Sequence, residues 1–241
     1  MAWKPRLVLS DIDGTLTVRR GSLLLSLEAV EAVRMLEGEG VPVSLVTGNS
    51  VPVAAGLARY IGASGPVVAE NGCTVFHRGE LHHVCDGRPP GELESILAGA
   101  GFRASWQNPY RHHDLAFLPP GGLGPEEALA VVRSAMEEVG WDGVVLWSGF
   151  AFHIAPRGAS KTRGAALAAS LLGAGLADAL AVGDGENDLD LLEAAGVSAA
   201  PGDAAERVRA RVDYVASKPG GSGFAEIARL ALGGRLQRRR P

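Results

Sequence analysis

The sequence is poor in cysteine and has no long hydrophobic run. Its 241 residues contain 2 cysteines, Cys73 and Cys85, too few for a disulfide framework and without metal-ligand spacing. We therefore expect both thiols to be reduced. No apolar run approaches the roughly 20 residues that span a bilayer, and Met1 to Pro5 shows no apolar signal region. These absences favour a cytoplasmic protein without a membrane partner.

An excess of basic residues is missing as well. The formal net charge of −4 argues against nucleic acid as a partner. One basic cluster, Arg235 with Arg238-Arg239-Arg240, lies at the C-terminus, where we expect a solvated tail. There is neither a solenoid repeat nor a long low-complexity tract. The 46% hydrophobic content allows one large α/β domain or a core with a smaller inserted domain.

Apolar runs and helical patterns alternate along the first 75 residues. The runs at 7–9, 41–46 and 67–69 are separated by helical patterns that begin near Ser26 and Ser50. Continuous apolar strands joined by helices predict a Rossmann-like parallel sheet that is covered on both faces.

The pattern changes near Gly79. Helical segments at 92–100 and 125–139 accompany strand-like segments at 115–118 and 144–154, the last split by the turn Ser148-Gly149 into a hairpin. The β/α alternation then resumes, with strands near 179–182, 197–199 and 214–216. We predict an α/β fold whose parallel-sheet core, residues 1–78 and 157–241, is interrupted by a smaller α/β domain at residues 79–156.

Two aspartates follow the first apolar run, in the segment Asp11-Ile12-Asp13-Gly14-Thr15. Carboxylates at the end of a buried strand are costly to desolvate without a cation. Mg²⁺ prefers oxygen ligands and keeps positions open for phosphate, and Gly14 allows a tight turn that exposes backbone amides to an anion. The segment predicts a carboxylate nucleophile at a metal and phosphate site, with a simple Asx turn as the structural alternative.

Three later segments carry residues that suit the same metal and phosphate site. Thr47-Gly48-Asn49 follows the strand at 41–46, and Gly183-Asp184-Gly185-Glu186-Asn187-Asp188 follows the strand at 179–182. Lys161 comes directly after Ser160 at the start of a predicted helix, where a merely solvated lysine is unfavourable because the helix N-terminus is already positive. Ligands of parallel sheets gather at the carboxyl ends of the strands, so these segments are expected to converge.

In this order, the four motifs resemble those of the haloacid dehalogenase-like hydrolase superfamily. The segment Gly65–Gly72 is similar to its Cof-like branch. Phe152-His153-Ile154, Gly185–Asp188 and Lys218-Pro219 resemble archaeal-type phosphoglycolate phosphatases, which implies a cytoplasmic, Mg²⁺-dependent enzyme with a small α/β cap. The run Gly220–Gly223 is richer in glycine than the resemblance leads us to expect, so it leaves one loop in doubt.

Residues and resemblance together assign roles to the motif side chains. Asp11 is the expected nucleophile, and Asp13 the acid and base that protonates the leaving alcohol and then activates water. Thr47 and Gly48 are expected to bind the transferring phosphoryl group together with Lys161, which offers a point charge. The expected Mg²⁺ ligands are Asp11, Asp13 (through its backbone carbonyl, as the resemblance implies), Asp184 and Asp188, the last either directly or through water.

Other residues are open to more than one interpretation. The turn Glu70-Asn71-Gly72 is either structural or part of the site, and Asn187 is either a site residue or a helix cap. His153, on a mostly apolar strand, is more often structural than substrate-binding. Arg111-His112-His113 is expected to be a solvated turn, with recognition of a substrate anion as the alternative.

The expected reaction is hydrolysis of a small phosphorylated metabolite through an aspartyl phosphate, and the resemblance implies 2-phosphoglycolate as the substrate. A sugar phosphatase or phosphomutase is the alternative within the same superfamily. A phospho-accepting signalling receiver belongs to a different class, but it would be about half this length and its acceptor would lie on a central strand. Asp13 is the sharper discriminator, because a resident acid and base shortens the life of an acyl phosphate. The sequence leaves the oligomeric state open, with a homodimer as one option.

Overall fold

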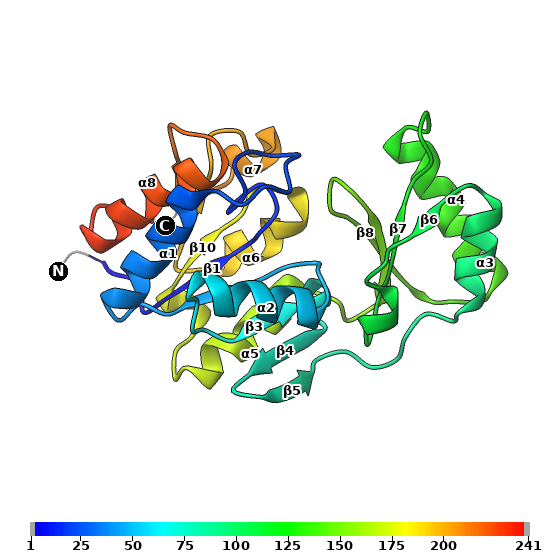
Figure 1. The fold of residues 1–241 in the computed structure, drawn as a ribbon, viewed down its shortest axis with the longest axis horizontal. Coiled ribbons are helices and arrows are strands. Elements are labelled where there is room, and N and C mark those ends of the chain that lie inside the picture. Colours follow the sequence, from blue (N-terminus) through cyan, green and yellow to red (C-terminus); the bar gives the residue numbers. More distant parts are fainter. Residues whose placement is uncertain (1–2, 239–241) are drawn as a thin grey trace.

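The larger lobe is built on a parallel sheet. The computed structural model describes residues 3–238, and its main sheet has five strands in the order β12-β11-β10-β1-β2. Two neighbouring strands of this sheet, β1 and β10, are labelled in Figure 1. All neighbouring strands pair in parallel, which confirms the predicted architecture. The strands are β1 (Leu7–Ser10), β2 (Val43–Leu45), β10 (Ala179–Val182), β11 (Val197–Ala200) and β12 (Tyr214–Val215).

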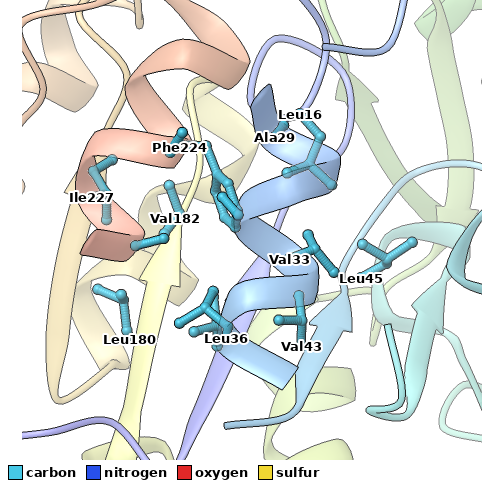
Figure 2. Packing of buried hydrophobic residues seen from close by; sticks show 14 of the residues in the cluster. Leu16, Ala29, Val33, Leu36, Val43, Leu45, Leu180, Val182, Phe224 and Ile227 are labelled. Atoms are coloured by element: carbon cyan, nitrogen blue, oxygen red, sulfur yellow. The ribbon is translucent and has the colours of Figure 1, made fainter. Parts of the chain in front are cut away.

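Helices cover both faces of this sheet because successive strand residues point to opposite sides. Val8 packs with one set of helices, whereas Leu7 and Leu9 pack with the other. Figure 2 shows the first cluster, where Phe224 lies against Val182 between two helices and the sheet. On that side lie α1 (Leu27–Gly38), α2 (Val51–Ile61) and α8 (Gly220–Leu232); on the other lie α5 (Lys161–Leu171) and α6 (Leu189–Ala194).

The glycine run that left a loop in doubt forms the first turn of α8. This helix packs closely on α1. A Cβ atom on Gly221 would lie 2.2 Å from the Cβ of Ser26, the N-cap residue of α1. Gly221 therefore allows α8 to lie close to α1, whereas Gly220 and Gly223 lie against the backbone of Thr17 and of Lys218.

A small antiparallel sheet continues the edge of the main one. It consists of β3 (Val67–Ala69), β4 (Thr74–His77) and β5 (Glu80–His83). A parallel bridge between Val46 and Val68 joins β3 to the end of β2. The strand β5 lies inside the range 79–156 that the sequence predicted for the inserted domain, yet it pairs with β4 in the larger lobe.

The prediction that both cysteines are reduced is wrong: Cys73 and Cys85 form a disulfide. They are 12 residues apart in the sequence, and the β4–β5 hairpin turns the chain back between them. The bond fastens the turn before β4 to the segment that leaves β5. Two isolated cysteines carry no spacing signal for such a pairing, because the hairpin and not the sequence interval brings them together.

The chain between β5 and α5 contains a second lobe with its own core, here called the insert (Figure 1). Phe117 and Phe152 are fully buried in this core. The predicted hairpin at Ser148-Gly149 is confirmed, since β8 and β9 pair in antiparallel fashion across it. The elements of the insert are α3 (Glu92–Gly99), β6 (Arg103–Ala104), β7 (Leu115–Leu118), α4 (Pro125–Glu138), β8 (Gly143–Trp147) and β9 (Phe152–Pro156), with sheet order β6-β7-β9-β8.

The remaining helices are short. They are η1 (Glu70–Gly72), η2 (Asn108–Tyr110), η3 (Leu176–Asp178), η4 (Glu186–Asp188) and α7 (Glu206–Arg209). Across residues 3–238, no helix combines the length and the apolar character needed to cross a membrane. Of the C-terminal basic cluster, Arg235 and Arg238 are exposed, while Arg239 and Arg240 lie outside the described residues.

Candidate active site

The ends of three adjacent strands bring the predicted motifs together. Asp11 follows β1, Thr47 follows β2 and Asp184 follows β10, and β1 lies between the other two strands in the parallel sheet. The turn after β1 comes very close to the turn after β10. Gly14 has φ +87°, and a Cβ on it would lie 2.3 Å from the Asp184 carboxylate. The glycine is therefore required for both the turn and the close approach.

Lys161, the first residue of α5, points into this group of carboxylates. Its Nζ lies 2.9 Å from Asp11 Oδ1 and 2.6 Å from Asp188 Oδ1, and the side chain is only 3% exposed. Burial by itself lowers the pKa of the ammonium, but the carboxylates of Asp11 and Asp188 outweigh it and raise the pKa above its ordinary value. Lys161 is thus a permanently charged, fixed cation beside Asp11.

Asp11, Asp184 and Asp188 form a compact oxygen cluster. One carboxylate oxygen from each can be chosen so that all three lie within 4.8 Å of one another. The Asp188 carboxylate is oriented by the backbone N–H groups of Asp184 (3.1 Å) and Gly185 (3.0 Å). Asp188, and not Asn187, is therefore the residue that fixes this loop at the start of α6.

The cluster carries more negative charge than its cations offset. Burial, followed by repulsion from Asp188, raises the pKa of Asp184 to about 7, although Arg20 Nε lies 3.1 Å from its Oδ2. Burial is also the main reason that the pKa of Asp11 is raised well above its ordinary value, since it outweighs the opposing effect of Lys161. A donor set made only of crowded carboxylate oxygens fits a hard divalent cation such as Mg²⁺.

Asp13 and Thr47 are linked by the side chain of Asn49. The amide Nδ2 of Asn49 donates to Asp13 Oδ2 at 3.0 Å and to Thr47 Oγ1 at 3.1 Å. The backbone N–H of Asn49 also donates to Thr47 Oγ1, at 3.1 Å. Because Thr47 Oγ1 accepts both bonds, its own hydroxyl hydrogen can be donated elsewhere.

A cavity of about 470 Å³ separates these residues from the insert. Asp11, Asp13 and Lys161 line it from the core. Those that line it from the insert include Arg103, Gln107, Arg111, Phe150 and His153. His112 and His113 are not among its lining residues.

The prediction that Arg111-His112-His113 forms a solvated turn is wrong for two of its residues. Arg111 and His113 are 3% and 7% exposed. Arg111 Nη1 donates to Asp114 Oδ1 at 2.7 Å and to the carbonyl of Gly48 at 2.9 Å. The arginine is buried because it ties the insert to the predicted phosphate-binding turn, and the buried carboxylate of Asp114 balances its charge.

The turn at Glu70 has a structural role that the sequence left open. Its carboxylate accepts hydrogen bonds from the backbone N–H groups of His112 (3.0 Å) and His113 (2.7 Å). Glu70 thus clamps the loop that carries Arg111 and Asp114. His153 joins the same network through a 2.9 Å contact between its Nδ1 and Asp114 Oδ2, so it is both structural and cavity-lining.

Some residues of the site had no assigned role from the sequence. Arg20 forms an ion pair with Asp184, and Arg103 and Gln107 line the cavity from the insert. None of these belongs to a motif with recognisable spacing. Asn49 also had no assigned role, but it follows Thr47-Gly48 directly at a strand end, and this position could have marked it as a site residue.

The fold and the cluster define an α/β enzyme whose acidic site lies at the strand ends, beneath an inserted domain. The family model described as haloacid dehalogenase-like hydrolase matches residues 8–97 and 126–227. The chain belongs to this family of hydrolases.

Relatives and a solved structure match over nearly the whole chain. The phosphoglycolate phosphatase of Aeropyrum pernix is 45% identical over 238 residues, covering 97% of this chain and 96% of the relative. Phosphoglycolate phosphatase 1 of Saccharolobus solfataricus is 34% identical, with 95% and 96% covered. A crystal structure from Thermoplasma acidophilum has a TM-score of 0.82 at 27% identity and covers 95% of this chain and 99% of that one.

Proposed function

We propose that this chain is a Mg²⁺-dependent phosphomonoester hydrolase that works through an aspartyl phosphate, with 2-phosphoglycolate as its substrate. The observation that carries the proposal is the Asp11 carboxylate, which borders the cavity 2.9 Å from the buried Lys161 ammonium. Curated relatives that are 45% and 34% identical carry the name phosphoglycolate phosphatase, which supports the choice of substrate.

In the first step, a carboxylate oxygen of Asp11 attacks phosphorus while the bond from phosphorus to the leaving oxygen breaks. The carboxyl group of Asp13 gives its proton to that oxygen, which therefore leaves as a hydroxyl group and not as an alkoxide. Burial raises the pKa of Asp13 even though Asn49 and Lys161 oppose the shift, which favours the protonated form needed here. Lys161 and the hydroxyl of Thr47 bind phosphoryl oxygens, together with the backbone amide of Gly48.

In the second step, the Asp13 carboxylate takes a proton from water, and the water oxygen bonds to phosphorus. The bond between phosphorus and Asp11 breaks, which releases inorganic phosphate and restores both aspartates. The carboxylates of Asp11, Asp184 and Asp188, with the backbone carbonyl of Asp13, are the proposed Mg²⁺ ligands. When bound, the ion supplies positive charge against the phosphoryl oxygens and the crowded carboxylates.

The insert, within the predicted range 79–156, is proposed to act as a cap and to select the substrate. Its arginines Arg103 and Arg111 line the cavity; because Arg111 is already paired with Asp114, the exposed Arg103 is the one that suits a second negative group such as the carboxylate of 2-phosphoglycolate. Because β5 pairs with β4, the segments that can bend are those after β5 and after β9. Closure would exclude water from the reacting groups.

The test is a comparison of kcat/KM for 2-phosphoglycolate and for glucose 6-phosphate. We expect a preference for 2-phosphoglycolate of at least roughly tenfold, which corresponds to about 1.4 kcal/mol of transition-state binding. A preference for the hexose phosphate would overturn the substrate assignment and favour a sugar phosphatase. No turnover of any phosphomonoester would contradict the proposed reaction itself.

A further inference from the structure

Gln107 of the insert reaches across the cavity to the core. It lies between β6 and η2, and its backbone N–H donates to Ser105 Oγ at 3.2 Å. Its side-chain Nε2 donates to Asn49 Oδ1 at 2.8 Å. Since Asn49 in turn donates to Asp13 Oδ2 at 3.0 Å, a chain of two amides joins the insert to the proposed acid and base.

The direction of this chain is fixed by donors that cannot reverse. The oxygen Oε1 of Gln107 accepts from the backbone N–H of Ser50 at 2.8 Å and from Arg111 Nη2 at 3.5 Å. A backbone N–H and a guanidinium can only donate, so the Gln107 oxygen must face them and its NH₂ group must face Asn49. The Asn49 oxygen then faces Gln107, and its NH₂ group faces Asp13 and Thr47.

This orientation decides which oxygen of Asp13 can hold a proton. Oδ2 accepts from the Asn49 NH₂ group, so a proton on the protonated carboxyl belongs on Oδ1. Without Gln107, the bond to Thr47 Oγ1 still holds the Asn49 NH₂ group, but the Asn49 amide could turn over at the cost of that bond and present its oxygen to Asp13. A protonated Asp13 would then donate to Asn49, and its proton would point away from the leaving group.

We propose that Gln107 is a positioning residue that, through Asn49, aims the Asp13 proton at the leaving oxygen when the insert is docked. The inference rests on the proposed function, because it concerns the proton that Asp13 transfers as the bond to the leaving oxygen breaks. Closure of the insert would thereby complete the acid catalyst. An open insert would remove the Gln107 contact and leave the bond to Thr47 Oγ1 to orient Asn49, and with it Asp13.

The test uses two esters of similar size whose leaving groups differ in basicity. Phenyl phosphate releases a basic phenolate that needs a proton, whereas 4-nitrophenyl phosphate releases a stable anion that does not. For each ester, kcat/KM reports the step that breaks this bond. In Gln107→Leu we expect kcat/KM to fall at least about tenfold for phenyl phosphate and less than about threefold for 4-nitrophenyl phosphate. The tenfold loss is a part of the roughly 10²- to 10⁴-fold that a positioned acid contributes.

Two further variants separate positioning from general damage. Gln107→Glu keeps an acceptor for the Ser50 N–H but loses the donor to Asn49, so it should show the same selective loss. His83→Ala removes a contact between core and insert, the 2.8 Å pair of His83 Nδ1 with His113 Nε2, outside the cavity. In that variant any change in kcat/KM should be the same for both esters.

A double-mutant cycle with Asn49→Ala gives the decisive readout. If Gln107 acts only through Asn49, adding Gln107→Leu to Asn49→Ala should reduce kcat/KM for phenyl phosphate by less than about twofold. Equal losses on both esters, or independent losses in the double variant, would overturn the positioning role. Wild-type hydrolysis of either ester supports the proposed function separately, so a failure of one proposal can be distinguished from a failure of the other.

Discussion

The buried carboxylate of Asp114 shows how single residues hold the insert against the core. Burial raises its pKa, yet Arg111 and His153 outweigh that effect, and the pKa lies below its ordinary value. For the pKa of His153, burial is the larger effect. Burial lowers its pKa despite the contact with Asp114, so the imidazole resists protonation in the folded protein.

This lowered pKa of His153 predicts a pH dependence of stability. The unfolded chain binds a proton near the ordinary histidine pKa of 6.5, before the folded protein does. The stability contributed by His153 is therefore complete above that pKa and declines as the pH falls below it. In urea unfolding at about pH 7, His153→Gln should lower the free energy of unfolding by about 1–3 kcal/mol, and the difference from wild type should shrink at about pH 5. A difference that grows at the lower pH would contradict the prediction.

At the residue scale, the sequence predicts the core side of the site better than the insert side. Asp11, Thr47 and Asp184 follow apolar runs, and the ends of parallel strands meet at one edge of a sheet. The proximity of these three residues therefore follows from the sequence pattern alone. Arg103 and Gln107 reach the cavity only because of the way the insert packs on the core, and no local pattern encodes that packing.

At the scale of elements, the hairpin from β3 to β5 supports the segment that leads to the insert. It carries Glu70, which clamps the insert loop, and the disulfide between Cys73 and Cys85. The sequence did not predict β5, whose residues Glu80–His83 lack an apolar alternation. It also did not predict α8, because its glycine-rich first turn is typical of loops; the close neighbours of these glycines, such as Ser26 at Gly221 and Thr17 at Gly220, are far away in the sequence.

The disulfide should contribute measurably to stability. Closing a loop of this size restricts the unfolded chain, and the sequence separation of 12 between the cysteines corresponds to about 3 kcal/mol at most. Urea unfolding with and without a phosphine reductant should show a lower midpoint for the reduced protein. The double variant Cys73→Ser, Cys85→Ser serves as the control, since its midpoint should not respond to the reductant. An unchanged wild-type midpoint after verified reduction would contradict the contribution.

At the scale of the whole molecule, the core carries the proposed reacting groups and the insert lines the same cavity from the other lobe. The cluster of Asp11, Asp184 and Asp188 lies where the two lobes face each other. Lys161 offsets part of its negative charge. The remainder is what a divalent cation would balance.

Metal removal tests this charge balance. Chelation with EDTA should abolish phosphatase activity, and added Mg²⁺ should restore it. Mg²⁺ should also raise the thermal midpoint of the chelated wild-type protein, because an ion that binds only the folded state stabilises it. Asp184→Asn should lose this shift, whereas Asp190→Asn, an exposed neighbour on α6, should retain it. Full activity after exhaustive chelation would exclude the metal assignment.

The central claim is that Asp11 is the group that carries the phosphoryl intermediate. The most direct measurement is mass spectrometry of acid-quenched, protease-digested enzyme after brief exposure to 2-phosphoglycolate. We predict one phosphoryl adduct on Asp11, which is absent in Asp11→Asn. An adduct on Asp13, or continued turnover by Asp11→Asn, would contradict the assignment.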